Sequence, residues 1–459
     1  MVKVLFVVRD LEAEHPGIML LSSILKKANH SADIVEANYN KIIRKLRKDN
    51  FPILAFSSVS TFIRDYLNLN HKIKERFNVL SFFGGPHPTY FPEVINEPGV
   101  DGVCIGEGDF ALLDLVNNLA VGKPITGISN WWIKQDGEIF YNSPRPLVED
   151  LDSLPFADRT LFPCFDIVTM VTTRGCFYSC SFCLQKSPFR YRSVENVIEE
   201  LKKIKTDKYA RFVVFRDSIF NLFPEWLKKF SEKYRKEVGL PFWCNVRADL
   251  ITPEVTRYLK EAGCFSVSLG LETANDYLRN EVLKKGISRD QITCAVDTIK
   301  KYKIRLVINN MIGIPFGSLK DDLDTLKLNI QYRPDYGRAY MTTIFKNTDL
   351  CNFVIKDYKV LQRPYKYACL DSYAFIPTAR KIKNLYKLFS IVVEFPFLFP
   401  ILQFLIKLPL RWIYALFYYT WLGYCQYYRI WAGSSLGSKK YTKGLKQYFK
   451  LLQRYFRNI

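Results

Sequence analysis

Histidine is scarce in this chain, whose 459 residues include only four, at positions 15, 30, 71 and 87. Zinc sites usually draw on histidine or on paired C-x2-C units, so the scarcity disfavours a histidine-rich metal site. A secretory leader is not expected either, because the apolar run 4–8 is short and no small-residue cleavage site follows it. We therefore expect a cytoplasmic protein whose 11 cysteines form no disulfides.

Clean apolar runs long enough to span a membrane are also lacking. The stretch 388–406 is almost wholly apolar, but Glu394, Pro396 and Pro400 interrupt it. The following stretch, 412–431, is crowded with tyrosine, tryptophan and phenylalanine. Neither stretch is typical of a transmembrane helix.

Positive charge gathers at the C-terminal end. Residues 379–459 contain 14 lysines and arginines and one acid, and so supply 13 of the net charge of +21. Aromatic, proline and cationic residues suit segments in a membrane interface, where each nearby cation contributes about 1 kcal/mol of attraction to anionic lipid. A packed helical subdomain with a solvated basic face explains the same composition. An RNA-binding tail explains it less well, because the aromatics lie in apolar runs and not among the lysines.

Three of the cysteines fall within eight positions, at the spacing C-x3-C-x2-C. Cys176, Cys180 and Cys183 follow the β-rich run 167–171, so they lie on a loop that leaves the end of a strand. Three thiolates on a short loop can hold three irons of a [4Fe-4S] cluster and leave the fourth iron open to another ligand. Gly175, just before the first cysteine, lets the backbone turn closely.

Two other interpretations of the three cysteines stay open. A structural zinc site normally needs a fourth ligand, and none of the histidines lies near this loop. Chance clustering of structural cysteines is the second, although the other eight cysteines are scattered singly.

At these residues the chain resembles the radical S-adenosylmethionine (SAM) superfamily, whose signature has the same spacing and an aromatic residue, here Phe182, before the last cysteine. The resemblance implies that SAM chelates the open iron. It also implies that an electron from the cluster cleaves SAM to methionine and a 5′-deoxyadenosyl radical, which abstracts hydrogen from an inert C–H bond. An electron donor of the flavodoxin or ferredoxin type is then expected as a partner.

The N-terminal part, residues 1–125, alternates strand-like and helical patterns. Such alternation predicts a doubly wound parallel sheet, Rossmann or flavodoxin-like, which binds ligands beyond the carboxyl ends of its strands. The expected elements are strands at 4–8, 32–36, 53–57, 79–83 and 102–105 and helices at 18–28, 41–48, 66–76 and 110–119.

Loops at these strand ends resemble those of the cobalamin-binding domain that precedes the radical SAM domain in one branch of the superfamily. The resemblance rests on Pro16-Gly17, the loop 84–89 and Gly106-Glu107-Gly108, and it implies cobalamin contacts at Ser57, Gly84, Gly85, His87 and Glu107. The D-x-H-x-x-G pattern that supplies a histidine to cobalt is absent, so cobalt would lack that ligand. A relic domain that binds no corrinoid is the alternative.

Six strand-like runs separated by helical patterns predict a partial (β/α)6 TIM-like barrel over residues 166–345. The segment Thr252-Pro253-Glu254 predicts the start of one of its helices, because it supplies an N-cap residue, a proline at the first helical position and an acid in the first turn. Residues 126–165 are expected to form a linker, with a small hairpin near Trp131-Trp132, and residues 346–459 an α-helical, aromatic and basic C-terminal region. The strand-like runs are 167–172, 212–215, 242–245, 265–269, 306–309 and 339–344.

The ends of these strands supply the expected SAM contacts. By resemblance, Phe182 belongs to the site, Gly270 and Glu272 contact the SAM ribose, and Gly313 lies along the adenine. Two further candidates are Asp217, near the SAM amino group, and Arg247, whose guanidinium matches a carboxylate but also suits an ordinary salt bridge. Three residues, Tyr178, Tyr340 and Cys351, are candidates for the acid or radical quencher on the substrate side.

The whole pattern is similar to that of cobalamin-dependent radical SAM methyltransferases. In these, one SAM methylates cob(I)alamin, a second generates the radical, and the substrate radical takes the methyl group from methylcobalamin. We expect methylation of an unactivated carbon on an apolar or lipid-like substrate, by an enzyme attached at the inner membrane face. The alternatives are a radical cyclase or rearrangement enzyme, a non-catalytic Fe-S/SAM sensor, and an RNA-modifying enzyme, although no dedicated nucleic-acid module is recognisable.

Overall fold

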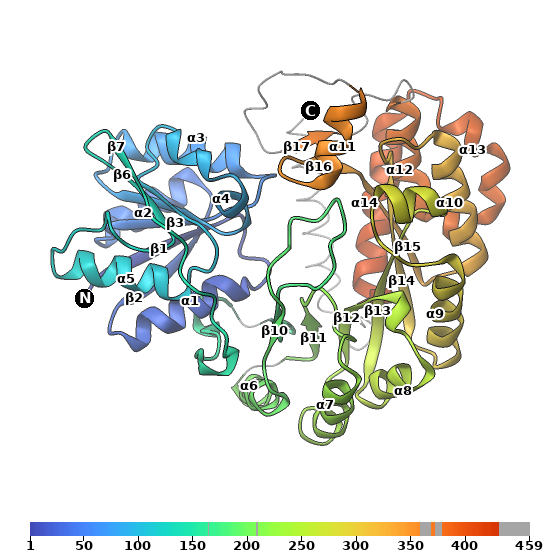
Figure 1. Cartoon of the computed structure of the whole chain (residues 1–459), viewed down its shortest axis with the longest axis horizontal. Helices are drawn as coiled ribbons and strands as arrows, with labels where there is room; N and C mark the ends of the chain where they lie inside the picture. Colours follow the sequence, from blue (N-terminus) through green and yellow to red (C-terminus); the bar gives the residue numbers. More distant parts are fainter. Residues whose placement is uncertain (164, 208–209, 359–368, 372–378, 431–459) are drawn as a thin grey trace. The chain divides into compact units, whose positions relative to one another are not determined.

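The computed structural model describes residues 1–163, 165–207, 210–358, 369–371 and 379–430. These residues form two compact units, the first made of Met1–Phe165 with Arg190–Ser193 and the second of the remaining described residues (Figure 1). Cys164 and the last part of the basic C-terminal region, 431–459, lie outside the described residues.

The first unit alternates strands and helices as the sequence predicts. Its main elements are β1 (Lys3–Val8), α1 (Pro16–Lys27), β2 (Ser31–Glu36), α2 (Tyr39–Lys48), β3 (Ile53–Ser57), α3 (Ile63–Lys74), β4 (Leu80–Gly84), α4 (Pro86–Tyr90), η1 (Pro92–Asn96), β5 (Gly102–Cys104), α5 (Asp109–Ala120), β6 (Trp131–Gln135) and β7 (Glu138–Tyr141). Three short elements follow, η2 (Leu151–Ser153), η3 (Arg159–Leu161) and β10 (Arg190–Tyr191).

These strands form one sheet in the order β2-β1-β3-β4-β5-β6-β7, with β1 to β5 mutually parallel. Alternate residues of β1 point to opposite faces, so Phe6 packs with Met19 of α1 while Val7 packs with Ile42 of α2. Helices therefore cover both faces, and the doubly wound fold is confirmed. Since β1 lies between β2 and β3, the order in which strands are added to the sheet reverses between β1 and β3. Open sheets of this kind bind ligands at such a point.

The sheet continues past residue 125, where the sequence analysis places the end of the first domain. Trp131 of β6 pairs antiparallel with Cys104 of β5, and β6 pairs with β7 as the expected hairpin. Trp131 is buried against Phe82, and its indole Nε1 donates to the carbonyl oxygen of Ala111 at 2.8 Å. This packing makes the segment part of the sheet.

The second unit contains the six parallel strands that the sequence predicts. Its elements are β8 (Ile167–Met170), β9 (Thr173–Arg174), α6 (Val194–Asp207), β11 (Phe212–Phe215), α7 (Pro224–Glu237), β12 (Phe242–Val246), η4 (Ala248–Leu250), α8 (Pro253–Glu261), β13 (Cys264–Glu272), η5 (Leu278–Val282), α9 (Arg289–Lys301), β14 (Arg305–Ile312), α10 (Leu319–Tyr332), β15 (Tyr336–Met341), β16 (Thr343–Phe345), α11 (Asp349–Tyr358), β17 (Cys369–Asp371), α12 (Ala379–Glu394), η7 (Pro396–Leu398), α13 (Phe399–Leu405), α14 (Arg411–Tyr424) and η8 (Cys425–Ile430).

The strands follow the order β15-β14-β13-β12-β11-β8, in which every neighbouring pair is parallel. Helices α6 to α9 bury their apolar sides against one face of this sheet, which leaves the other face as the interior of an open barrel. Helix α8 begins where the sequence predicts, because the Thr252 side chain accepts a hydrogen bond from the backbone N–H of Val255. The predicted partial barrel is confirmed.

The last helices pack on the edge of this barrel (Figure 1). Leu385 and Phe389 of α12 are buried against Ala339 of β15 and Leu402 of α13. None of the described helices is both long and apolar enough to cross a membrane.

Candidate functional site

The cysteine loop begins with a glycine that no other residue can replace without strain. Gly175 has φ of +83°, and a Cβ at this position would lie 2.1 Å from the carbonyl oxygen of Pro188. The next residue, Cys176, donates its backbone N–H to the carbonyl oxygen of Ser187 at 3.2 Å. The loop is thus folded back on its own later segment, as the expected close turn at Gly175 requires.

Ser181, between the second and third cysteines, anchors the loop to η5 and α11. Its backbone N–H donates to the carbonyl oxygen of Leu283 at 3.0 Å, and its hydroxyl donates to that of Val282 at 2.6 Å. Its own carbonyl oxygen accepts from the N–H of Leu350 at 3.0 Å. The residue is fully buried, so these bonds hold the loop without competition from water.

The three thiols lie on this anchored loop as free, partly buried groups. Burial raises the pKa of Cys180 and Cys183. Within the described part of the chain, no three His, Cys, Asp or Glu side chains stand close enough to hold a single metal ion. A [4Fe-4S] cluster differs, because each thiolate binds a separate iron. The loop therefore fits the cluster chemistry.

Asp217 controls where the chain leaves β8 for the cysteine loop. One carboxylate oxygen accepts from the backbone N–H groups of Thr172 and Thr173, at 2.8 and 2.6 Å, and both threonine hydroxyls donate to the same carboxylate. Burial raises the pKa of Asp217, against the effect of these four bonds. Because the carboxylate is occupied in this way, Asp217 acts as a positioning residue here. Its expected contact with the SAM amino group remains a prediction.

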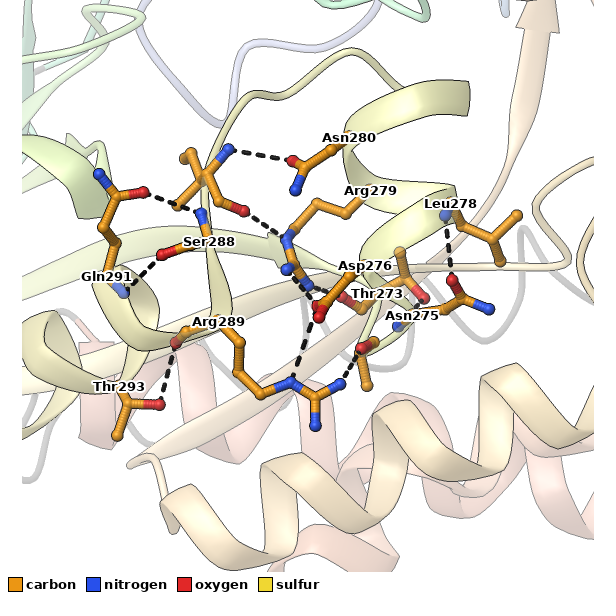
Figure 2. A network of polar contacts seen from close by, with 12 residues as sticks. Thr273, Asn275, Asp276, Leu278, Arg279, Asn280, Ser288, Arg289, Gln291 and Thr293 are labelled. Atoms are coloured by element: carbon orange, nitrogen blue, oxygen red, sulfur yellow. Dashed lines mark hydrogen bonds and ion pairs between the residues drawn. The ribbon is translucent and has the colours of Figure 1, made fainter.

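A buried arginine supports η5, on which the cysteine loop rests. The Arg279 side chain is fully buried, and its guanidinium donates to the carbonyl oxygens of Ile287 and Thr273, at 2.8 and 2.9 Å, and to Asp276 (Figure 2). It thereby ties together the start and the end of segment 273–287. The carbonyl groups that hold Ser181 belong to this same segment.

Glu272 and Gly270 lie at the end of β13, where SAM contacts are expected. The Glu272 carboxylate pairs with Lys285 at 2.5 Å. A Cβ on Gly270 would come within 2.2 Å of the Glu272 side chain and 2.5 Å of Lys285, so a larger residue would displace this ion pair. Glu272 itself has φ of +65°, an unusual backbone conformation for a residue with a side chain.

Two further candidates have defined partners. The Arg247 guanidinium lies 3.5 Å from the centre of the Tyr178 ring and donates to Asp249 at 3.1 Å. In this structure Arg247 thus forms an ordinary salt bridge, which was one of its two expected roles. Gly313 has φ of +67°, and its N–H donates to the carboxylate of Asp322 at 3.1 Å. Burial raises the pKa of Asp322 to about 7. The SAM contacts of Arg247 and Gly313 stay predictions.

Of the remaining candidate residues, Phe182 and Cys351 lie in an apolar cluster, and Tyr340 lies in the barrel interior. Phe182 packs with buried Leu283, Ile314 and Cys351, and burial raises the pKa of Cys351. Tyr340 is 41% exposed at the end of β15. Cys351 is thus a packing residue in this structure, whereas Tyr340 is open to a ligand.

In the first unit, Ser58 joins the loops that follow β3 and β4. Its N–H and hydroxyl both donate to the carbonyl oxygen of Gly84, at 2.9 and 3.1 Å, and its own carbonyl oxygen accepts from the N–H of His87 at 3.0 Å. Gly85 has φ of +93°, and a Cβ there would lie 3.1 Å from Ser58 and 3.7 Å from the Ser57 hydroxyl. Gly85 thus lets these two loops pack directly together, and we call them the glycine crest. The crest lies at the carboxyl ends of β3 and β4, where open sheets of this kind bind ligands such as a corrinoid.

His87 and Glu107 have partners within the first unit. The Nδ1 atom of His87 is 3.0 Å from the Ser60 hydroxyl, and burial lowers the pKa of His87 to about 4, which keeps the ring neutral at physiological pH. The Glu107 carboxylate accepts two hydrogen bonds from Arg190, at 2.8 and 3.1 Å, and one from the N–H of Val148. The tentative cobalamin contacts of His87 and Glu107 remain predictions.

Sequence reasoning missed four residues that organise these sites, namely Ser58, Ser181, Arg279 and Asp322. Ser58 and Ser181 lie inside motifs that were recognised, so proximity in sequence was an available signal. No local pattern distinguishes Arg279 or Asp322 from a surface charge, because their partners are created by the fold.

Replacing Gly175 by alanine should strongly reduce cluster content. The added Cβ collides with the backbone of Pro188, whereas Gly122 has φ of +69° and nothing lies within 4 Å of the place that its Cβ would take. Gly122→Ala is therefore a matched control that carries the backbone strain of roughly 1 kcal/mol without the collision. Iron analysis and visible absorbance after anaerobic reconstitution measure the effect. Full iron content in Gly175→Ala would contradict this account of the loop.

Replacing Arg279 by methionine should destabilise the second unit by about 2–5 kcal/mol, because it leaves the buried carbonyl groups of Thr273 and Ile287 without their donor. Arg289 contacts Asp276, which is also a partner of Arg279, at 3.7 Å but is half-exposed, so Arg289→Met should cost less than about 1 kcal/mol (Figure 2). Urea unfolding of both variants under anaerobic conditions measures the difference. Similar midpoints for the two variants would disprove the supporting role of Arg279.

Comparison with known proteins identifies both domains. Residues 170–328 match the radical SAM superfamily model, and residues 2–116 match that of the B12 binding domain. An uncharacterized methyltransferase of Pyrococcus horikoshii is 28% identical over 379 residues, which cover 77% of this chain and 82% of that protein.

Two solved structures share the fold. The cobalamin-dependent SAM radical enzyme OxsB superposes with a TM-score of 0.69 at 16% identity, covering 93% of this chain and 72% of that chain. The radical SAM methyltransferase TsrM from Kitasatospora setae gives 0.67 at 14% identity, covering 77% of this chain and 76% of that chain.

A radical SAM domain uses a [4Fe-4S] cluster, SAM and an external electron donor, and a B12-binding domain uses cobalamin. The cysteine loop and the glycine crest fit these groups. The chain is an enzyme, and its radical SAM and B12-binding domains place it in the cobalamin-binding branch of the radical SAM superfamily.

Proposed function

We propose that this enzyme methylates an unactivated carbon of an apolar, lipid-like substrate. Two features of the same chain support the proposal. The anchored three-cysteine loop lies at the strand ends of a radical SAM barrel, and a B12-type sheet carries the glycine crest at Gly84 and Gly85. When bound, the cluster and SAM supply a radical that removes hydrogen, and cobalamin supplies a methyl group. A flavodoxin or ferredoxin in a reducing cytoplasm is the proposed electron donor.

The chain's own residues position these groups. In the second unit, Gly175 and Ser181 shape the loop that presents the thiols, and Asp217 sets its starting point. Gly270 leaves the space at the end of β13 that the Glu272–Lys285 ion pair fills. In the first unit, Gly85 lets the loop after β4 pack directly against the backbone of Ser58.

The outer side of the C-terminal helices supports an apolar substrate taken from a membrane surface. Phe397, Phe404 and Phe417 are 74%, 64% and 53% exposed, although other residues of α13 and α14 are buried. Residues 395–430 contain no aspartate or glutamate, and Lys407 and Arg411 are exposed among these aromatics. Exposed aromatic side chains with nearby cations suit the interface of an anionic bilayer.

The methyl-transfer proposal predicts a labelled product. Holoenzyme prepared with cobalamin and without oxygen, given methyl-labelled SAM, a reductant and a membrane lipid extract, should release 5′-deoxyadenosine and transfer label to an apolar compound. Mass spectrometry of the extract detects the product, and Cys180→Ala serves as the inactive control. A product that gains a ring or loses hydrogen without label would support cyclisation or rearrangement instead. Absence of 5′-deoxyadenosine would favour a sensor.

The membrane proposal predicts co-sedimentation with vesicles that contain phosphatidylglycerol and weaker binding to phosphatidylcholine vesicles. The double variant Phe404→Glu/Phe417→Glu should reduce binding at least about tenfold, because it places two charges in the bilayer interface. Tyr141→Glu, which alters an aromatic of the first unit that is 65% exposed, is the control and should bind normally. Equal binding by the double variant would disprove the role of α13 and α14.

A further inference from the structure

The side chains that β11 directs into the barrel are apolar, and a cationic residue, Arg216, follows them at the carboxyl end of the strand. Val213 and Phe215 pack outward with Phe230 of α7, whereas Phe212 and Val214 pack on the opposite face with Trp243. Because side chains alternate along a strand, the next residue, Arg216, continues the inner row. It lies at the carboxyl end of the strand, which is the active end of such barrels.

Strand β15 contributes a second inner row, formed by Tyr336, Arg338 and Tyr340. Tyr336 is buried with Cys425 and Ile430 of η8, while Ala339, of the opposite parity, packs outward against α12. Arg338 therefore lies one inward step from Tyr336 toward the carboxyl end of the strand.

The other end of the barrel interior is closed by η8. The Ser266 hydroxyl of β13 donates to the carbonyl oxygen of Ile430 at 2.7 Å, and Arg305 of β14 donates to that of Tyr428 at 2.7 Å. These contacts lie at the amino ends of β13 and β14. A ligand of the interior is therefore confined to the level of Arg216 and Arg338.

These two arginines differ from the buried arginines of the chain. The four described arginines that are buried, Arg159, Arg190, Arg247 and Arg279, each pair with a carboxylate. Within the described residues, neither Arg216 nor Arg338 has a carboxylate partner. Arg338 lies 4.8 Å from the centre of the Tyr340 ring, and its Nε atom is buried without a hydrogen-bond partner.

The two guanidinium groups also influence each other. Arg216 is exposed and Arg338 is half-buried in this structure; partial desolvation lowers the pKa of Arg216, and the positive charge of Arg338 lowers it further. Two like charges that influence each other in this way favour an anion between them. A carboxylate matches this arrangement, since each guanidinium can donate parallel hydrogen bonds to its two oxygens.

We propose that Arg216 and Arg338 together bind a carboxylate of the substrate inside the barrel, so that the substrate is an amphipathic organic acid. This inference rests on the proposed methyl transfer and specifies its substrate class. The carboxylate of SAM is the other possible source. The substrate is favoured because Asp217, the expected SAM contact next to Arg216, has its carboxylate occupied by Thr172 and Thr173. The other expected SAM residues follow β8, β12, β13 and β14, whereas Arg338 lies on β15.

Titration calorimetry of SAM-saturated holoenzyme without oxygen tests this site, with 4-butylbenzoate and the neutral 4-butylbenzamide as probes. The acid should bind at least about tenfold more tightly than the amide. Arg216→Gln and Arg338→Gln should each abolish that preference. Arg257→Gln is the control, because Arg257 pairs with Glu261 on the exposed side of α8. Equal or undetectable binding of the two probes to the unaltered enzyme, or a preference that survives in both variants, would overturn the proposal.

Separate titrations with SAM distinguish the two carboxylate sources. The proposal expects unchanged SAM affinity and unchanged iron content in both variants. A loss of SAM affinity with an intact probe preference would overturn the substrate assignment and place the SAM carboxylate at these arginines. Probe binding does not require turnover, so failure of methyl transfer with an intact acid preference would refute the proposed reaction and leave the carboxylate site standing.

Discussion

The buried guanidinium of Arg279 is the interaction on which the cluster site depends. It holds together the two ends of segment 273–287, and the carbonyl groups of that segment fix Ser181 between two of the cysteines. The Glu272–Lys285 ion pair spans the same segment, and Arg247 donates to the carbonyl oxygen of Lys285 at 2.6 Å. One desolvated charge thereby couples the cysteine loop to the strand ends at which SAM is expected.

Glycines with positive φ perform the corresponding role in both units. Gly175 and Gly85 place backbone where a side chain would collide, and each lies next to a loop that must come close to a large cofactor. Glycine loses more conformational entropy on folding than other residues, but it allows backbone conformations and close approaches that a side chain would prevent. Hydrogen bonds from neighbouring serines, Ser181 and Ser58, then keep each loop in place.

Much of the fold was predictable because its signals are local. Alternation of apolar runs and helical patterns predicted five parallel strands in the first unit and six in the second. The position of β6 and β7 was harder to foresee, because their contribution depends on Trp131 packing against Phe82. The partners of Asp217 and Glu107 were likewise hidden, since Thr172 and Arg190 are 45 and 83 residues away in the sequence.

By itself, the sequence determined the kind of chemistry, since the cysteine spacing and the glycines of the strand-end loops are properties of short segments. Only the tertiary structure decided which charges are paired. Arg247 and Arg216 both follow strand ends in the sequence, yet Arg247 meets Asp249 and Arg216 faces the barrel interior near Arg338. The physical reason is that electrostatic partnership depends on distance and burial, which are set when remote strands assemble into one sheet.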